Sequence, residues 1–170
     1  MALFPGWQAP DFATDTTTGP IRFHAWGQDC WRIVLTHPGD YSLPSLRAAL
    51  HRARTGIPDL RLLGLSPLSM PQHDHMPNGM MVTPDMPDFT IIHDDADHIR
   101  AMWQGIAVDT GPTGIPDDEH AVFIVDPKHV IRGTISYPPA PGLRDFEEVI
   151  RIMLELDNGC STLEPTRYAA

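Results

Sequence analysis

Short apolar runs alternate along this chain with polar segments that are rich in proline. The runs contain many β-branched and aromatic residues, which is typical of buried strands. They lie at 31–36, 60–65, 89–92 and 121–125. The turn-rich start of the chain indicates a hairpin or extended arm with a short strand at 21–23, and 130–137 can return as an antiparallel strand. The pattern therefore predicts a sheet of short strands.

Helical periodicity occurs in three segments. The first begins at Pro44 and ends at Gly56, and the others cover 94–105 and 145–156, the last one closed by 158–159. The first helix stands between two buried strands, which makes a βαβ unit with parallel strands and a right-handed crossover. The sequence thus predicts one α/β domain that covers 1–170.

An irregular segment at 66–87 interrupts this domain and is rich in Pro, Met and His. A loop of this length in a compact domain is usually functional. Its histidines His73 and His75, with Asp and Met beside them, could bind a soft or borderline metal. A surface loop with solvated histidines is the preferred interpretation, because a metal site needs three or four ligands in fixed geometry. We therefore expect no metal and no other cofactor.

The composition excludes several classes of function. The chain has 170 residues with 12 basic and 22 acidic side chains, and its net charge is −10. Such a surface repels phosphate backbones and anionic lipids, so neither nucleic acid nor membrane is an expected partner. The first residues have neither the basic region nor the apolar region of a signal peptide, and we expect a cytoplasmic protein. Cys30 and Cys160 are too few for a disulfide framework.

Four stretches of sequence follow one another in an order that resembles the peroxiredoxin family, within the AhpC/TSA superfamily, and most of all its 1-Cys subgroup. They are Ala-Pro-Asp-Phe at 9–12, Ile-Arg-Phe-His at 21–24 with Cys-Trp at 30–31, His-Pro-Gly-Asp-Tyr-Ser at 37–42, and the strand at 121–127 with the segments that follow it to 148. The resemblance implies a thioredoxin-like α/β fold, with a central mixed sheet flanked by helices, and a homodimer. It also implies that the C-terminal arm domain of the 1-Cys subgroup is absent from 1–170.

The chain departs from the family at the site of the chemistry. In the family, the active-site loop leads into a helix whose first turn holds the peroxidatic cysteine. The resemblance places Ser45 at that cysteine, His120 at the partner arginine, and Arg144 at the second arginine. A serine hydroxyl stays protonated, and its oxygen has no reversible oxidation steps. We therefore expect that the protein is not a conventional thiol peroxidase.

Other reactive side chains stand in this pocket, and they suggest a different use for it. The candidate catalytic residues are Ser45, His37, His120 and Arg144. The candidate pocket residues are Asp40, Tyr41, Ser42 and Pro44. A histidine can act as general acid or base, a serine as nucleophile or donor, and an arginine as charge clamp. The first hypothesis is a repurposed enzyme that acts on a small-molecule ligand. The alternative is a non-catalytic binding or scaffold protein that keeps the fold.

A second candidate site contains a thiol. The 1-Cys subgroup carries a serine at the position of Cys30 and pairs it with the histidine that matches His24. A Cys30–His24 dyad would support residual thiol-dependent peroxidase or hydrolase activity. Asp126 could be a third member, although the family's aspartate falls on Lys128. A small buried cysteine at a strand entrance is the commoner arrangement. Cys160 is expected to be a passive thiol behind the last helix.

Overall fold

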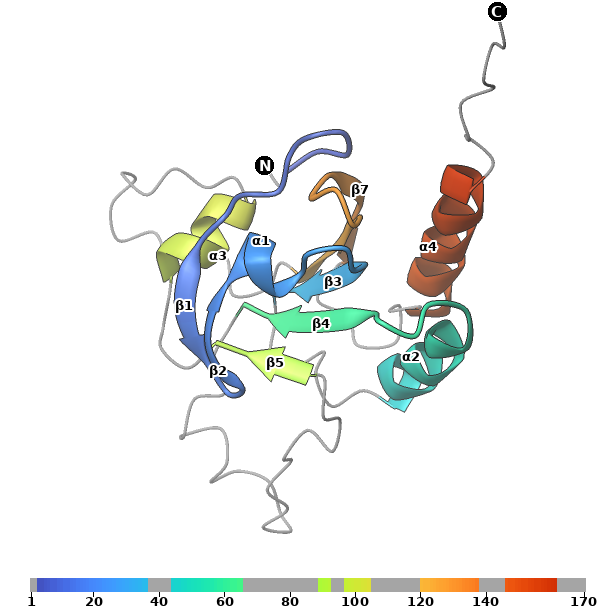
Figure 1. Ribbon diagram of the computed structural model, residues 1–170, viewed down its shortest axis with the longest axis horizontal. Coiled ribbons are helices and arrows are strands. Elements are labelled where there is room, and N and C mark those ends of the chain that lie inside the picture. Colours follow the sequence, from blue (N-terminus) through green and yellow to red (C-terminus); the bar gives the residue numbers. More distant parts are fainter. Residues whose placement is uncertain are drawn as a thin grey trace, which may run out of the picture.

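The computed structural model describes residues 3–36, 44–65, 89–92, 97–104, 120–137 and 146–161. Its elements in chain order are β1 (Ala13–Thr16), β2 (Gly19–Arg22), α1 (Phe23–Trp26), β3 (Arg32–Leu35), α2 (Pro44–Gly56), β4 (Arg61–Gly64), β5 (Phe89–Ile91), α3 (Asp97–Gln104), β6 (His120–Val125), β7 (Ile131–Tyr137) and α4 (Phe146–Ser161). Strands β1 and β2 form a hairpin, and the other described strands form one sheet in the order β5-β4-β3-β6-β7 (Figure 1).

Strand β3 lies in the middle of this sheet. It runs parallel to β4, with Ile33 opposite Leu62, and antiparallel to β6, with Ile33 opposite Ile124. All four of its residues are buried, which explains why residues 33–35 are apolar without alternation. The parallel β3–α2–β4 unit and the antiparallel return of β7 along β6 confirm the predicted mixed sheet.

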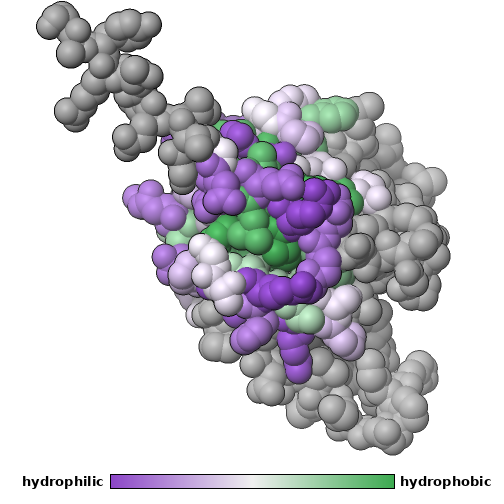
Figure 2. Space-filling model, turned by 90° about the vertical axis from the view of Figure 1, so that its right-hand side faces the viewer, coloured by the Kyte–Doolittle hydropathy of each residue, from purple (hydrophilic) through white to green (hydrophobic). Residues whose placement is uncertain are grey.

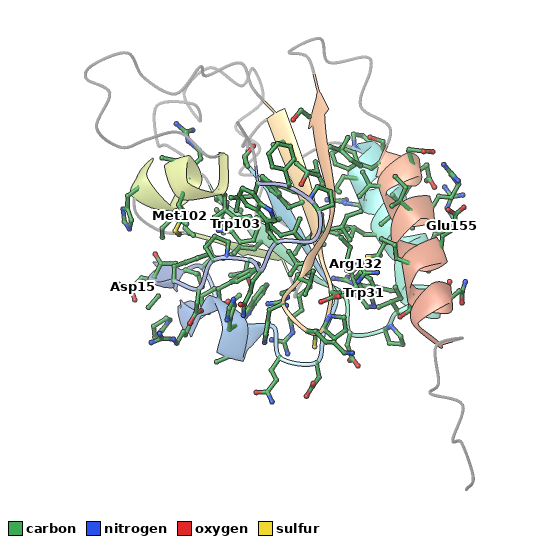
Figure 3. All side chains as sticks on the ribbon, turned by 90° about the horizontal axis from the view of Figure 1, so that it is seen from above. Asp15, Trp31, Met102, Trp103, Arg132 and Glu155 are labelled. Atoms are coloured by element: carbon green, nitrogen blue, oxygen red, sulfur yellow. The ribbon has the colours of Figure 1, made fainter. Side chains whose placement is uncertain are left out.

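The helices cover the two faces of the sheet. Helices α2 and α4 lie on one side, and α1 and α3 lie on the other side (Figure 3). Between α2, α4 and the sheet lies a core to which α2 contributes Leu46, Ala49, Leu50 and Ala53. The opposite core surrounds Trp103 of α3, which is fully buried against Phe23 and Phe123. Strands β3, β4 and β6 are therefore packed on both faces by apolar side chains.

The outer face of α2 and α4 is polar. Polar side chains surround a small apolar area on the side of the molecule where these two helices lie (Figure 2). Arg52 of α2 forms an ion pair with Glu147 of α4, and Arg151 forms ion pairs with Glu148 and Glu155 on its own helix. The two pairs of Arg151 follow the i,i+3 and i,i+4 spacing of a solvated helix face.

Two sequence predictions about the helices are wrong. Helix α4 continues to Ser161 instead of ending at 158–159, so Cys160 lies in its last turn and not behind the helix. The space beside Gly159 is open, and a glycine inside a helix only weakens it by about 1 kcal/mol, which does not force an end. Phe23 begins helix α1 instead of closing a strand, because four residues are too few to show a helical period.

Candidate functional site

Ser45 lies in the first turn of α2, directly after Pro44, which begins the helix. Proline is favourable at this first position because its missing N–H would have no partner inside the helix. Both residues are exposed, and the first turn carries no acidic side chain that would use its free N–H groups. The Ser45 hydroxyl therefore lies at the positive end of a helix of 13 residues, where developing negative charge is stabilised.

Thr36 fastens the carboxyl end of β3 to the beginning of β6. Its side chain is buried, and its Oγ1 accepts the N–H of Ala121 at 2.9 Å and donates to the carbonyl oxygen of Ala121 at 3.2 Å. Its own N–H donates to the same carbonyl at 3.2 Å. Ala121 follows His120, the first residue of β6, whose main chain pairs with Tyr137 of β7. Thr36 thus fixes where His120 stands relative to β3.

The start of α4 lies beside the second half of α2. Leu46, next to Ser45, packs in one buried cluster with Leu35 at the end of β3, Val122 of β6 and Phe146 at the start of α4. The ion pair between Arg52 and Glu147 joins the two helices from outside. These contacts place the first residues of β6 beside the end of β3, and the start of α4 beside α2.

Several candidate residues are not described by the structure. They are His37, Asp40, Tyr41, Ser42, Arg144, His73 and His75. Within the described ranges, no group of three or more His, Cys, Asp or Glu residues could hold a metal ion. Nor does any helix in those ranges combine the length and the apolar character that crossing a membrane requires.

The two cysteines lie far from Ser45. Cys30 precedes β3, at the opposite end of the strand from Thr36, and about 20 Å of extended chain separates residues 30 and 36. Cys160 lies in the last turn of α4, and the helix rises by about 21 Å between Phe146 and that turn. Neither position is at the beginning of α2.

His24, the proposed partner of Cys30, makes other contacts. Its Nε2 lies 2.7 Å from the carbonyl oxygen of Ala9, and its ring stacks on that of His129 with 4.2 Å between centroids. Cys30 is partly buried and forms no disulfide, and no hydrogen bond joins its thiol to the His24 ring. The described contacts of His24 therefore lead to the turn between β6 and β7.

Arg32, which the sequence analysis missed, is fully buried beside this histidine pair. Its Nη2 donates to the carbonyl oxygen of Asp126 at 2.8 Å and to Nδ1 of His129 at 2.9 Å. The guanidinium also lies 4.7 Å from the centre of the Phe23 ring and donates to the Phe23 carbonyl oxygen at 3.4 Å. Burial lowers the pKa of Arg32 to about 10, so the group remains charged at neutral pH. The only sequence signal was a charged residue at the start of an apolar run.

The Asp126 carboxylate shapes the β6–β7 turn. Its Oδ1 accepts the N–H groups of Lys128 and Val130, both at 2.9 Å, and its Oδ2 lies 3.6 Å from Nη1 of Arg132. Asp126, the candidate third member beside Cys30 and His24, therefore uses its carboxylate within its own turn. Through this turn it positions His129, whose φ of 67° is left-handed.

Two titratable groups beside the pair have shifted pKa values. Burial lowers the pKa of His129, and the positive charges of Arg32 and His24 lower it further against the attraction of Asp126 and Asp11. Burial opposes ionisation of Asp11, but the N–H of His24 and the Arg22 side chain outweigh it and lower the pKa of Asp11. The environment therefore favours a neutral His129 beside a charged Asp11.

Comparison with known proteins places this architecture in a class. The chain is 33% identical over 164 residues to peroxiredoxin-6 of Rattus norvegicus, covering 89% of this chain and 71% of the relative. It is 32% identical over 169 residues to peroxiredoxin-6 of Bos taurus, covering 91% and 73%. A search of protein-family models found no match.

Solved structures of peroxiredoxins share the fold of this chain. A cysteine-to-serine mutant of the peroxiredoxin 6 of Arenicola marina superposes with a TM-score of 0.67 at 26% identity, covering 94% of this chain and 76% of the other. Mycobacterium tuberculosis AhpC superposes with a TM-score of 0.66 at 19% identity, covering 94% and 96%, which shows the fold alone. The protein is therefore a thioredoxin-like α/β protein of the peroxiredoxin type. By its identity to the peroxiredoxin-6 relatives, the chain belongs to the peroxiredoxin family.

The close approach of Gly27 to Arg32 gives a test of this buried cluster. A Cβ on Gly27 would lie 2.1 Å from Cδ and 2.6 Å from Nε of Arg32, whose guanidinium is held by its own partners and cannot move aside. Gly27→Ala should therefore lower the free energy of unfolding by about 3 kcal/mol in urea denaturation. The control Gly159→Ala, in open space on α4, should raise it by about 0.5 kcal/mol. Equal effects of the two substitutions would contradict this packing.

Proposed function

We propose that this peroxiredoxin-family protein is not a thiol peroxidase, and that it uses the pocket at the beginning of α2 for acid–base chemistry on a small molecule. The observation that carries the proposal is Ser45, exposed in the first turn of the helix that follows β3. Family resemblance puts the peroxidatic cysteine at this position. Oxygen in place of sulfur removes the thiolate and the sulfenic acid on which peroxide reduction depends.

Neither cysteine of the chain can take over that role in the same pocket. Cys30 stands at the other end of β3, and Cys160 stands at the far end of α4, each about 20 Å along its element from the region of Ser45. Moving either sulfur to the beginning of α2 would require unfolding of the element that holds it. The pocket therefore has to work with oxygen and nitrogen groups.

The roles of the pocket residues follow from their chemistry. Ser45 supplies a hydroxyl at a helix N-terminus, which favours an oxyanion or a bound carboxylate. His120 or His37 would take a proton from the water that attacks the acyl carbon and return it to the alcohol oxygen that leaves, and Arg144 would hold a negative charge of the substrate. The hydrogen bonds of Thr36 with Ala121 support this arrangement, because they fix the first residues of β6 against the end of β3. Small esters and lactones that carry a free carboxylate are the substrate class that fits these groups.

Peroxide consumption is the direct test of the missing thiolate. With dithiothreitol as reductant, the wild-type protein should consume hydrogen peroxide no faster than its Cys30→Ser/Cys160→Ser variant, because no activated thiolate is present. Ser45→Cys should raise the rate at least tenfold, since it restores sulfur at the helix N-terminus. Hydrogen peroxide consumption by the wild-type protein that disappears in the Ser45→Ala variant would refute the proposal.

Hydrolysis of a panel of small esters and lactones tests the acid–base chemistry. Ser45→Ala and His120→Gln should each lower kcat/KM at least tenfold, since each removes a group that stabilises or transfers charge. The matched control His51→Gln changes an exposed residue further along α2 and should leave kcat/KM within twofold. If no ester or lactone is turned over and none raises the melting temperature, the protein is a scaffold that has kept the fold.

We also propose that the protein is a homodimer that pairs through β7. The β5 edge of the sheet is covered by the hairpin, because the N–H of Thr17 donates to the Ile91 carbonyl oxygen at 2.8 Å and Thr16 bridges Ile92. Beyond β7 no further strand occurs in the described residues. The main-chain N–H and C=O groups of Ala121 point to β3, so Ala121 forms no main-chain hydrogen bonds with its β7 partner Ser136. The N–H and C=O groups of Ser136 therefore point away from β6, to the outer edge of the sheet.

Ser136→Pro tests this interface, because it removes an outward N–H without removing a hydrogen bond to β6. Sedimentation velocity should show a wild-type dimer and a Ser136→Pro monomer with an unchanged circular dichroism spectrum. Ser136→Thr, which keeps the N–H, should remain dimeric. A wild-type monomer at micromolar concentration, or a dimeric Ser136→Pro variant, would exclude this mode of pairing.

A further inference from the structure

The contact between Arg32 and His129 determines the protonation state of the histidine. An arginine Nη atom can only donate, so Nδ1 of His129, 2.9 Å away, has to accept with a free lone pair. The ring proton of a neutral His129 is therefore on Nε2. A protonated His129 would turn an N–H toward the N–H of Arg32, and the hydrogen bond would become a contact between two cations.

A second histidine strengthens this restriction. Nε2 of His24 faces the carbonyl oxygen of Ala9 at 2.7 Å and has to donate, because a carbonyl oxygen only accepts. The two imidazole rings lie nearly parallel, with an interplanar angle of 12° and centroids 4.2 Å apart. A charge added to either ring would lie against the other ring and close to the buried Arg32. A charge on the His129 ring is therefore opposed by the buried cation of Arg32.

The same two histidines hold residues 6–9, which we call the strap. The carbonyl oxygen of His129 accepts the N–H of Ala9 at 2.8 Å, and His24 donates to the carbonyl oxygen of Ala9. At the other end of the strap, the N–H of Gly6 donates to the carbonyl oxygen of Ile131 at 2.7 Å. The N–H of Ile131 donates to the carbonyl oxygen of Trp7 at 2.8 Å. A displacement of His129 from Arg32 would therefore move the carbonyl group to which the strap is attached.

We propose that His129 is an acid-sensitive latch: its protonation breaks the hydrogen bond from Arg32 and releases the strap from the β6–β7 turn and the start of β7. The latch works at one edge of the fold, at the opposite end of β3 from Thr36, and so it does not depend on the chemistry proposed at Ser45. Its closed form is the one in the structure, with His129 accepting from Arg32 and with Ala9 held between the two histidines.

The charged groups around His129 come from every element that packs against it. Arg32 of β3 and His24 of α1 oppose a charge on the ring, whereas Asp126 of the same turn and Asp11 beyond the strap attract one. The two carboxylates are occupied elsewhere. Asp126 accepts from two N–H groups of its turn and lies 3.6 Å from Arg132, and Asp11 binds Arg22 at 2.8 Å. The cations therefore prevail, which agrees with the lowered pKa of His129.

Amide hydrogen exchange followed by NMR tests the latch in the whole protein. In the open form, His129 has the ordinary histidine pKa near 6.5, whereas in the closed form it binds a proton less readily. The closed form is therefore fully favoured above about pH 6.5 and loses stability relative to the open form as the pH falls. Between pH 7.5 and 5.5, the protection factors of the Gly6, Ala9 and Ile131 amides should fall about tenfold. The amides of β3 and β6 should keep theirs. Unchanged strap protection would overturn the proposal.

Two variants identify the titrating residue. His129→Asn keeps an acceptor oxygen near the position of Nδ1 and tolerates the left-handed φ of 67°, but it cannot be protonated, so strap protection should no longer depend on pH. His24→Gln keeps a donor for Ala9 and should retain the pH dependence. The opposite pattern would assign the effect to His24 and refute the latch at His129. In the wild-type protein, the imidazole ¹⁵N shifts at pH 7.5 should show an unprotonated Nδ1 on His129, and a protonated one would refute it without any variant.

Discussion

The central position of β3 is the constraint on which the rest of the molecule depends. The strand is short and buried on both faces, and it bonds to β4 on one side and to β6 on the other. Because β3 is buried, the chain reaches the protein surface only beyond its two ends. A polar residue at each end is held by buried hydrogen bonds. Thr36 is bound to Ala121 at the carboxyl end, and Arg32 is bound to the β6–β7 turn at the amino end. The two candidate regions are thus the two ends of one strand.

Arg32 shows how a buried charge is tolerated without an ion pair to a carboxylate. Carbonyl oxygens of Phe23 and Asp126, the Nδ1 of His129 and the face of the Phe23 ring share its positive charge. Each of these is a weaker partner than a carboxylate, but together they join α1, β3 and the β6–β7 turn. Removing a partner of a buried charge costs more than the bond itself contributes, because the charge is left desolvated. The same arrangement makes His129 sensitive to its own protonation.

In the proposed function, the peroxiredoxin fold is kept with a serine, Ser45, in the first turn of α2 where the family resemblance places the peroxidatic cysteine. A helix N-terminus stabilises negative charge whatever side chain stands there, so a serine can inherit an electrostatic environment that suits a thiolate. Fold alone does not determine the reaction, which has to be argued from the groups present. Sulfur and oxygen differ in acidity and in redox chemistry, and this difference separates the proposed activity from that of a thiol peroxidase.

The sequence by itself determined the βαβ unit, the mixed sheet and the stripe of Leu46, Ala49, Leu50 and Ala53 on α2, because periodicity and β-branched runs are local properties of the chain. It also determined that no cysteine occurs between Cys30 and Cys160. Only the tertiary structure decided that His24 contacts His129, that Arg32 is buried beside His129, and that α4 runs through Gly159. These outcomes depend on groups up to 105 residues apart in the chain, from His24 to His129, and on whether packing outweighs the weak helix propensity of one glycine, neither of which a local pattern contains.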